Sequence, residues 1–600
     1  MTRGAARAPS PDALPAGGAG EPSPGALSAR DARAPSPGAD TRSPAPTHAL
    51  GALPAPGAAD PLAPRMRWWG WGADRDAAPL PAAAEAMLRA EIGWTPRATR
   101  AVALQDVALP RPALAPAVRA ELVTIVGAGH VRDDRLTRVA HAVGRSLTDL
   151  LHIRAGDGST APDVVVFPAD HDEVARVLAA CARAGVAVVP FGGGTSVVGG
   201  VETVHEGFAG AIALNLARLD RVVDVDERSL LATLGAGLTG PRAEAALAVR
   251  GLTLGHFPQS FEFATIGGFV ATRSAGQAST GYGRIDALVR GLRMATPAGE
   301  LSVAPGPASA AGPALRELLV GSEGTLGVIT QATLRVHRAP AATRTEAWAL
   351  PSFAAGCEAF RALEQAGAAG TIMRLSDEDE TRMTLGLAGD RWGRPYLRLR
   401  GQRTPCLAIV AHEGSARHVR LRSLRAMRTL RRAGAVYLGA RAGEAWRRGR
   451  FAAPYLRDAL LYRGVLVETL ETATTWSSLA ALHTAVRAAL HEALRSQGTP
   501  PLVACHVSHL YPTGASLYFT TIARQAPGRE LEQWRAAKAA ASDAIAAHGA
   551  TITHHHAVGR DHAPWLHHET GALGLEVLRA LKATVDPVGI MNPGKLLPPT

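Results

Sequence analysis

Three separated stretches that combine glycine with small and hydroxyl side chains constrain this chain most. The first, 190–196, reads P-F-G-G-G-T-S; the second spans 258–277; the third, 321–329, reads G-S-E-G-T-L-G-V-I. Because glycine lacks a Cβ, backbone N–H groups in such turns can approach and converge on an anion such as a diphosphate. The first is neither a G-x-G-x-x-G fingerprint nor a P-loop. One such turn is usually only a turn, but three in order predict a site for a flat, polar-edged ligand.

Strand and helix patterns alternate around the first of these turns. Strands are expected at 164–167, 186–190, 211–214, 222–226 and 229–234, and helices at 172–185 and 240–250. This alternation predicts an α/β domain, which we place at 158–338.

The pattern changes after residue 338. Strands such as 346–350 and 406–412 alternate with long Ala/Arg-rich helical patterns at 415–432 and 530–548. We expect a second, α+β domain with an antiparallel sheet at 339–560, and a C-terminal segment, 561–600, that returns to the first domain. The fold class is therefore α+β, rich in α/β units.

The N-terminal part divides into a tail and a helical region. Residues 1–64 are rich in Ala, Pro, Gly and Ser and cannot bury enough apolar surface to fold, so we expect a disordered tail. Residues 65–157 should be helical, with helices at 116–127 and 134–151. No run of about 18 apolar residues is present, so we expect no transmembrane helix.

Charge and cysteine content exclude several classes. The net charge is +12, but the basic residues are scattered without interleaved aromatic residues, which argues against nucleic-acid binding and leaves anionic lipid headgroups or phosphorylated substrates as partners. The four cysteines lie far apart and predict neither a zinc nor a disulfide framework. We expect a cytoplasmic protein, and the Arg, Ala, Gly and Pro excess suggests a GC-rich bacterial source.

The order of the three glycine-rich stretches resembles the FAD-binding domain of the vanillyl-alcohol-oxidase flavoprotein superfamily, of the type called PCMH, which has two subdomains. Within it, the chain is most similar to the alkylglycerone-phosphate synthase (alkyl-dihydroxyacetonephosphate synthase) family from about residue 66 to 597. Further matching motifs are W-G-W-G at 69–72, Y-L-R-D at 455–458, E-T-L-E-T at 468–472 and H-H-H at 554–556.

The resemblance implies non-covalent FAD, with His256 only part of its surroundings. The residues expected to line FAD are Pro190, Phe191, Gly192, Gly193, Gly194, Thr195, Ser196, Pro258, Gln259, Ser260, Phe261, Glu262, Phe263, Ala264, Ala271, Thr272, Arg273, Ser274, Ala275, Gly276, Gln277, Glu323, Gly324, Thr325, Leu326, Gly327, Val328 and Ile329.

The resemblance also implies catalytic and substrate residues. Tyr518 matches a tyrosine that exchanges a proton with the substrate, Arg374 an arginine needed for activity, and Arg457 an arginine that binds substrate. His554, His555 and His556 match an essential histidine triplet, and residues 593–597 match a C-terminal stretch implicated in activity. On a strand, His554 and His556 would face one side and His555 the other, so at most two could share a cavity.

The implied reaction exchanges the acyl chain of acyl-dihydroxyacetone phosphate for a long-chain fatty alcohol, with reduced flavin N5 as covalent holder of the substrate carbon. Such lipid-like substrates also imply transient contact with a membrane surface, at its cytoplasmic face. A homodimer is expected from the resemblance alone.

Two alternatives remain. An FAD-dependent dehydrogenase or oxidase of 2-hydroxy acids such as D-lactate would share the fold and the ending N-P-G-K at 592–595. Such enzymes carry H-x-G-D-G-N-x-H and E-H-G-x-G stretches that hold a metal; here Tyr518 replaces a histidine and His555 a glutamate. These losses leave too few metal ligands, so we expect no metal and favour the transferase. A non-enzymatic flavin-binding protein would not need Tyr518 or the histidine triplet.

Overall fold

The computed structural model describes residues 60, 62–73, 80–387 and 393–598 of a chain that divides into two units, Met1–Gly57 and Ala58–Thr600. The tail predicted at 1–64 lies outside the described residues, apart from residues 60 and 62–64. All that follows concerns the second unit. No helix among its described residues is long and apolar enough to span a membrane.

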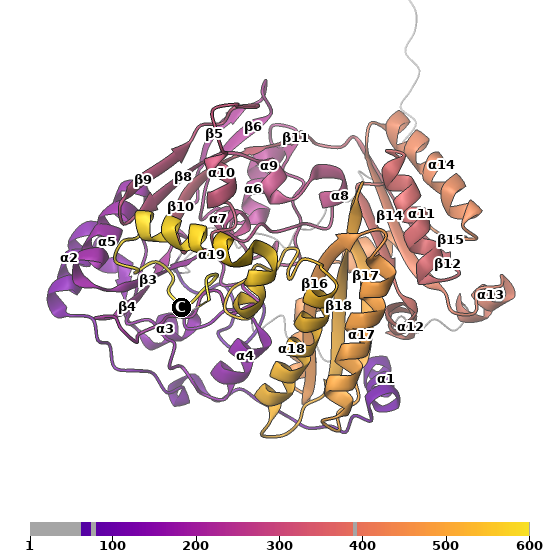
Figure 1. The fold of residues 1–600 in the computed structure, drawn as a ribbon, viewed down its shortest axis with the longest axis horizontal. Coiled ribbons are helices and arrows are strands. Elements are labelled where there is room, and N and C mark those ends of the chain that lie inside the picture. The colour runs from indigo at the N-terminus through magenta and orange to yellow at the C-terminus, as the bar shows by residue number, and fades with distance from the viewer. Residues whose placement is uncertain (1–59, 61, 74–79, 388–392, 599–600) are drawn as a thin grey trace, which may run out of the picture. The chain divides into compact units, whose positions relative to one another are not determined.

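A small sheet forms around the first glycine-rich turn (Figure 1). Its order is β1-β2-β4-β3, with strands Val131–Arg132, Val164–Val166, Ala211–Asn215 and Ala187–Phe191. Strands β2, β4 and β3 run parallel, and β4 is buried at every position, as expected for a parallel strand covered on both faces. Helices α2 (Pro116–Val126) and α5 (His171–Ala184) supply apolar side chains to the same core.

The helix predicted at 134–151 is two helices, α3 (Arg135–Ala140) and α4 (Leu147–Arg154), so that prediction was wrong. The break is a new N-cap: the Ser146 side chain accepts a hydrogen bond from the N–H of Asp149, and the Asp149 carboxylate accepts one from the N–H of Ser146. This reciprocal pair satisfies the backbone N–H groups of Ser146 and Asp149, which have no acceptor within the helix because α4 begins here. The helix α3 has its own cap, Asp134.

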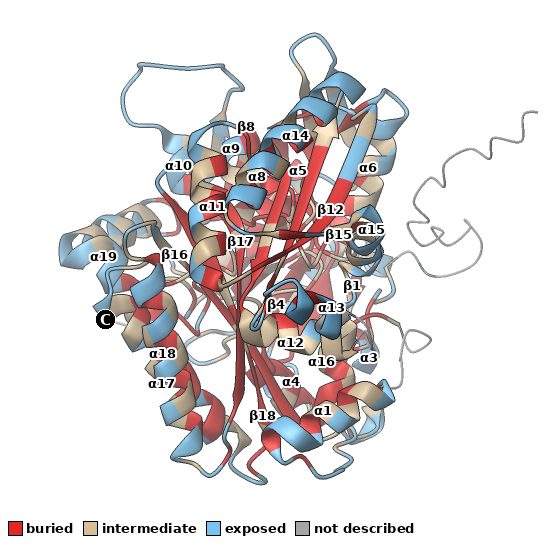
Figure 2. Ribbon diagram, turned by 90° about the vertical axis from the view of Figure 1, so that its right-hand side faces the viewer, coloured by how far each residue is buried: buried red, intermediate tan, exposed pale blue. Residues whose placement is uncertain are grey.

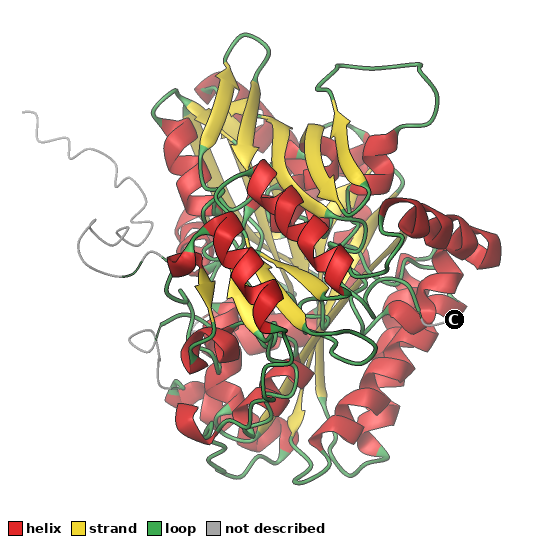
Figure 3. Cartoon of the chain, turned by 90° about the vertical axis from the view of Figure 1, so that its left-hand side faces the viewer, coloured by secondary structure: helices red, strands yellow, loops and turns green. Residues whose placement is uncertain are grey.

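A second, antiparallel sheet completes the first domain, with order β5-β6-β10-β8-β9. Its strands are Val222–Asp226, Leu231–Gly235, Val328–Arg335, Val289–Thr296 and Gly299–Val303, and strand β7 (Leu252–Thr253) pairs separately with β11 (His337–Arg338). The accompanying helices are α6 (Gly240–Ala248), α7 (Ile266–Ala271), α8 (Ser279–Tyr282), α9 (Ile285–Leu288) and α10 (Leu315–Leu319). Figure 3 distinguishes these strands from the surrounding helices.

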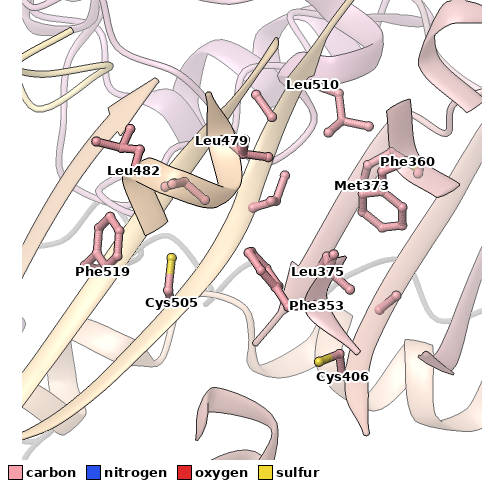
Figure 4. Packing of buried hydrophobic residues seen from close by; sticks show 14 of the residues in the cluster. Phe353, Phe360, Met373, Leu375, Cys406, Leu479, Leu482, Cys505, Leu510 and Phe519 are labelled. Atoms are coloured by element: carbon pink, nitrogen blue, oxygen red, sulfur yellow. The ribbon is translucent and has the colours of Figure 1, made fainter. Parts of the chain in front are cut away.

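The second domain is built on a seven-stranded antiparallel sheet of order β15-β12-β14-β13-β17-β18-β16. The strands are Val436–Gly439, Ala342–Leu350, Cys406–Gly414, Ile372–Ser376, Leu502–Tyr511, Gly514–Arg524 and Val465–Thr475. Helices α11 (Phe353–Gln365), α14 (Ala416–Arg432), α17 (Leu479–Arg495) and α18 (Glu530–Ala547) share one apolar core with it (Figure 4). The remaining helices are α12 (Glu378–Leu387), α13 (Gly393–Leu399), α15 (Ala440–Gly449) and α16 (Ala453–Leu461). The predicted α+β class is confirmed.

Both ends of the described chain join distant elements. Helix α1 (Ala82–Ile92) packs against apolar residues of β16, β17 and β18. After α19 (Leu566–Val585), Met591 forms a parallel bridge with Val188 of β3, and the Lys595 ammonium donates to the carbonyl of Glu202, 2.9 Å away. The end of the chain therefore lies against the strand that leads into the first glycine-rich turn.

Candidate active site

The candidate catalytic side chains come from one face of the seven-stranded sheet. On each strand the flanking residues enter the apolar core: Leu517 and Phe519 around position 518, Met373 and Leu375 around position 374. Because side chains alternate across a strand, Tyr518 and Arg374 point to the opposite face. The same alternation sends Glu471 of β16 and His506 of β17 to that face, and both are cross-strand partners of Tyr518.

The histidine triplet is gathered around the buried carboxylate of Glu471. This carboxylate accepts hydrogen bonds from three consecutive backbone N–H groups, those of His554, His555 and His556, at 2.5, 2.8 and 2.7 Å. The Thr553 hydroxyl donates a fourth at 2.8 Å. Such convergence requires a curled backbone, so the triplet does not lie on a strand.

All three imidazoles therefore share one cluster, and the expectation that at most two could do so was wrong. Neighbouring rings of the triplet have centroids 5.2 and 4.7 Å apart. The Tyr518 ring stacks on His555 at 6.0 Å and meets His556 edge-on at 5.5 Å. The phenol, which projects from the sheet, is thus packed against two rings of the triplet.

A bulge brings a further imidazole into the cluster. Residues 508 and 509 of β17 together oppose Ser516 of β18, since the pairing register shifts between Val507 and Leu510. A bulge re-aims side chains, so His509 reaches the site although His506, three positions earlier, also does. The His509 ring lies 5.0 Å from that of His554, and its Nε2 lies 2.9 Å from the carbonyl oxygen of Gly276.

Ring nitrogens of His509, His554 and His555 lie within 4.8 Å of one another, as do ligand atoms of Glu471, His555 and His556. Three imidazoles can hold zinc, so the expectation of too few ligands was wrong as an argument. However, His509 contacts the Ser508 hydroxyl and the Gly276 carbonyl, and His554 contacts the Tyr511 hydroxyl and His555. These hydrogen bonds already use both ring nitrogens of two members; a site without metal stays a prediction.

Burial sets the protonation states of the cluster. It lowers the pKa of His509 and of His555 to about 3, and lowers that of His554 well below its ordinary value, so these imidazoles are neutral at pH 7. Burial raises the pKa of Tyr518 to about 12, so the phenol keeps its proton. Burial opposes ionisation of Glu471 too, but the imidazoles and N–H groups around it hold its pKa well below the ordinary value.

Arg374 is separated from the Tyr518 phenol by the side chain of His506. Its guanidinium is 2.9 Å from Nε2 of His506 and donates to the Glu380 carboxylate at 2.7 Å. The His506 ring stacks on Tyr518, with centroids 4.9 Å apart. His506 therefore lies between Arg374 and Tyr518 and contacts both.

Arg457 lies on α16 among other arginines. It donates one hydrogen bond, to the carbonyl of Arg145 at 2.8 Å, while its buried Nε and Nη2 have no hydrogen-bond partner. Nε and Nη1 of Arg67 are likewise buried without one, although Arg67 pairs with Asp458 at 3.1 Å. Buried guanidinium donors without acceptors fit a phosphate.

The glycine-rich turn after β3 lines a cavity together with residues from five other segments. Gly192, Gly193 and Gly194 form one wall, and the remaining lining includes Asn215, Ala217, Gly237, Thr239, Phe263, Thr265, Arg145 and residues 62–66. A Cβ on Gly193 would lie 2.1 Å from the carbonyl oxygen of Phe263, so only glycine fits. This bare-backbone cradle fits the diphosphate of FAD.

The other predicted cofactor segments adjoin this turn. The N–H of Glu323 donates to the carbonyl of Ala271 at 2.9 Å, and a Cβ on Gly324 would contact Pro190. The Glu323 carboxylate accepts from the N–H groups of Val558 and Gly559, just after the histidine triplet. The predicted cofactor loops and the histidine cluster are therefore contiguous.

Sequence reasoning missed Glu471, His506 and His509 as site residues. The motif at 468–472 contained a signal, because an acidic residue between two core positions of a strand must face away from the core. The alternation C-H-V at 505–507 was a similar signal for His506. Nothing local predicts the bulge that turns His509 inward.

Comparisons with known proteins agree with this architecture. The model for "FAD binding domain" matches residues 162–304, and that for "FAD linked oxidases, C-terminal domain" matches 339–596. The chain thus combines the two domains of FAD-linked oxidases, a flavin-binding domain and a C-terminal domain that carries the candidate catalytic side chains.

The relatives narrow this class. Alkyldihydroxyacetonephosphate synthase from Dictyostelium discoideum is 32% identical over 83% of this chain and 84% of the relative, and that from Trypanosoma brucei brucei is 31% identical over 84% of both. A solved alkyldihydroxyacetonephosphate synthase structure, 29% identical, matches with a TM-score of 0.78 over 88% of this chain and 98% of the other. The chain belongs to the alkyldihydroxyacetonephosphate synthase family.

Proposed function

We propose that this protein is an FAD-dependent alkylglycerone-phosphate synthase that exchanges the acyl chain of acyl-dihydroxyacetone phosphate for a long-chain fatty alcohol. The ester C–O bond breaks at the dihydroxyacetone carbon, a fatty acid leaves, and the alcohol oxygen forms the ether bond while its proton is released. The observation that carries the proposal is the contact of Tyr518 with the histidine cluster beside the cofactor loops.

Bound FAD would supply the ring that holds the substrate carbon between departure of the acid and arrival of the alcohol. The protein's part is proton transfer and anchoring. A neutral imidazole, His555 or His556, would accept the proton from the carbon next to the ketone, and the ionised carboxylate of Glu471, 3.6 and 3.8 Å from their Nδ1 atoms, would stabilise the ring once it is protonated. The protonated phenol of Tyr518 donates a hydrogen bond to the oxygen on which negative charge develops.

The phosphate of the substrate would be held by Arg457, whose buried Nε and Nη2 make no hydrogen bond to the described residues, although Nη2 lies 3.9 Å from the Asp458 carboxylate. FAD would be held by residues 190–196, 258–264, 271–277 and 323–329 without a covalent bond. His256 supports this, because its ring is buried against Phe269 and its Nε2 contacts the Ser274 hydroxyl at 2.7 Å.

The decisive experiment supplies acyl-dihydroxyacetone phosphate and labelled hexadecanol without an electron acceptor. We expect label in the alkyl product and one fatty acid released for each product formed. The alternative function, a 2-hydroxy-acid dehydrogenase, would form no labelled alkyl product in this assay but would reduce a dye when D-lactate is supplied. Dye reduction without product, in a protein that contains FAD, would overturn the proposal.

Two further properties follow from the proposed reaction. Because both substrates carry long apolar chains, we propose peripheral contact with a membrane at its cytoplasmic face. We also propose a homodimer, to be tested by light scattering of the FAD-loaded protein.

A further inference from the structure

The outward face of α14 carries the densest positive charge of any helix among the described residues. Seven of its seventeen residues are arginine and none is acidic. Val419, Ser423, Ala426 and Leu430 are buried against the sheet and α11, which fixes the orientation of the helix. Figure 2 shows exposed residues along α14. The exposed arginines are Arg417, Arg420, Arg425, Arg428, Arg431 and Arg432.

These arginines do not serve the fold. Among the described residues, none of the six is ion-paired with a carboxylate, and Glu358 of the neighbouring helix α11 pairs with Arg361 of its own helix. The other acidic residue of α11, Glu364, lies near Arg422, which is on the flank of α14. Like charges three and four residues apart destabilise a helix. Their concentration on one face therefore points to an external anionic partner.

Two leucines lie in the middle of this face. Leu421 and Leu424 are 52% and 37% exposed. At 100° per residue they project between the exposed arginines, on the side opposite Val419 and Ala426. A helix with a cationic outer face and exposed leucines has the pattern of one that lies in the headgroup region of an anionic bilayer. A nucleic-acid backbone would match the arginines but not the leucines.

We propose that the outward face of α14 is the surface by which this protein docks peripherally on a bilayer of anionic phospholipids. The proposal rests on the proposed function only in that lipid substrates give a reason for docking. The arginines would contact lipid phosphates, and Leu421 and Leu424 would enter the boundary between headgroups and acyl chains.

The test is co-sedimentation of the full-length FAD-loaded protein with vesicles of phosphatidylcholine alone or with one third phosphatidylglycerol. We expect binding only to the anionic vesicles, with loss of binding at high salt. The variant R420Q/R425Q/R428Q/R431Q should bind at least about ten-fold more weakly, because each arginine near an anionic surface strengthens binding severalfold. Glutamine is a good helix former, so α14 should remain folded.

The matched control, R111Q/R221Q/R495Q/R535Q, removes four exposed arginines that are dispersed over other elements. It should bind vesicles like the wild-type protein. Equal loss of binding in both variants would show that only net charge matters and would overturn the proposal. Wild-type protein that binds only neutral vesicles, or that binds duplex DNA and no vesicles, would also overturn it. The α14 variant should keep full synthase turnover on short-chain, water-soluble substrates; this readout separates failure of docking from failure of the proposed function.

Discussion

The ring and the hydroxyl of Tyr518 have different roles, which a substitution can separate. The ring stacks against His506 and His555, while the hydroxyl is the group proposed to act on the substrate. Tyr518→Phe keeps the stacking and removes only Oη, so we expect turnover to fall about 10³-fold. FAD content and melting temperature should not change. Tyr437→Phe, at an exposed position against Trp348, is the control and should be silent. Normal turnover of Tyr518→Phe would refute the assignment.

Two glutamates three positions apart on β16 should respond differently to the same substitution. Glu471 is ionised and accepts four hydrogen bonds from residues 553–556, so in Glu471→Gln an amide NH₂ would face backbone donors. Removing one partner of a buried charged network costs about 3–5 kcal/mol, and we expect a lower melting temperature and lost turnover.

Glu468→Gln is the matched control. Burial raises the pKa of Glu468 to about 7, and its carboxylate accepts from Trp534 Nε1 at 2.8 Å, a bond that an amide oxygen can also accept. This variant should lose less than about 1 kcal/mol in the free energy of unfolding. Urea unfolding of both variants measures the contrast, and equal losses would contradict the special role of Glu471.

At the scale of elements, the sequence predicted what local periodicity determines. The expected strands at 211–214 and 222–226 and the expected helix at 415–432 appear almost unchanged. A buried apolar run specifies the first strand, a valine-rich run the second, and a 3.6-residue apolar period the helix. The break at Ser146 and the curled histidine triplet were not predicted. Both depend on a hydrogen-bond partner: the Asp149 side chain for the first, and Glu471, more than eighty residues away, for the second.

The junction between β3 and its glycine turn makes an element-level prediction. Gly193→Ala places a Cβ 2.1 Å from the carbonyl oxygen of Phe263, so the turn must shift and the cofactor cradle with it. We expect purified protein with a clearly reduced FAD content and a stability loss of about 1–3 kcal/mol. Gly129→Ala, where no atom lies within 4 Å of the new Cβ, is the control. The ratio of flavin absorbance to protein concentration measures the FAD content of both variants. Full FAD content in Gly193→Ala would argue against this turn as the diphosphate site.

At the scale of the whole second unit, buried ionisable groups predict how stability depends on pH. Burial lowers the pKa of seven histidines to about 3 or 4: His141, His256, His337, His412, His509, His555 and His562. It raises the pKa of four carboxyl groups to between about 6 and 9: Glu202, Glu323, Glu468 and Asp561. The two sets act in opposite directions.

Unfolded histidines bind protons below about pH 6.5 while the buried ones do not, so acid favours unfolding through them. The four carboxyl groups bind protons first in the folded state, so they add stability as pH falls from about 9 toward 5. The histidines outnumber the carboxyl groups, so unfolding takes up protons on balance near pH 5.5, and the free energy of unfolding falls as the pH drops through that range. The melting temperature should therefore peak near pH 7, fall gently toward pH 9 and fall steeply below pH 6. Differential scanning calorimetry across pH 5–9 measures this curve, and a melting temperature that is constant or rises from pH 7 to 5 would contradict the neutral state of the buried histidines.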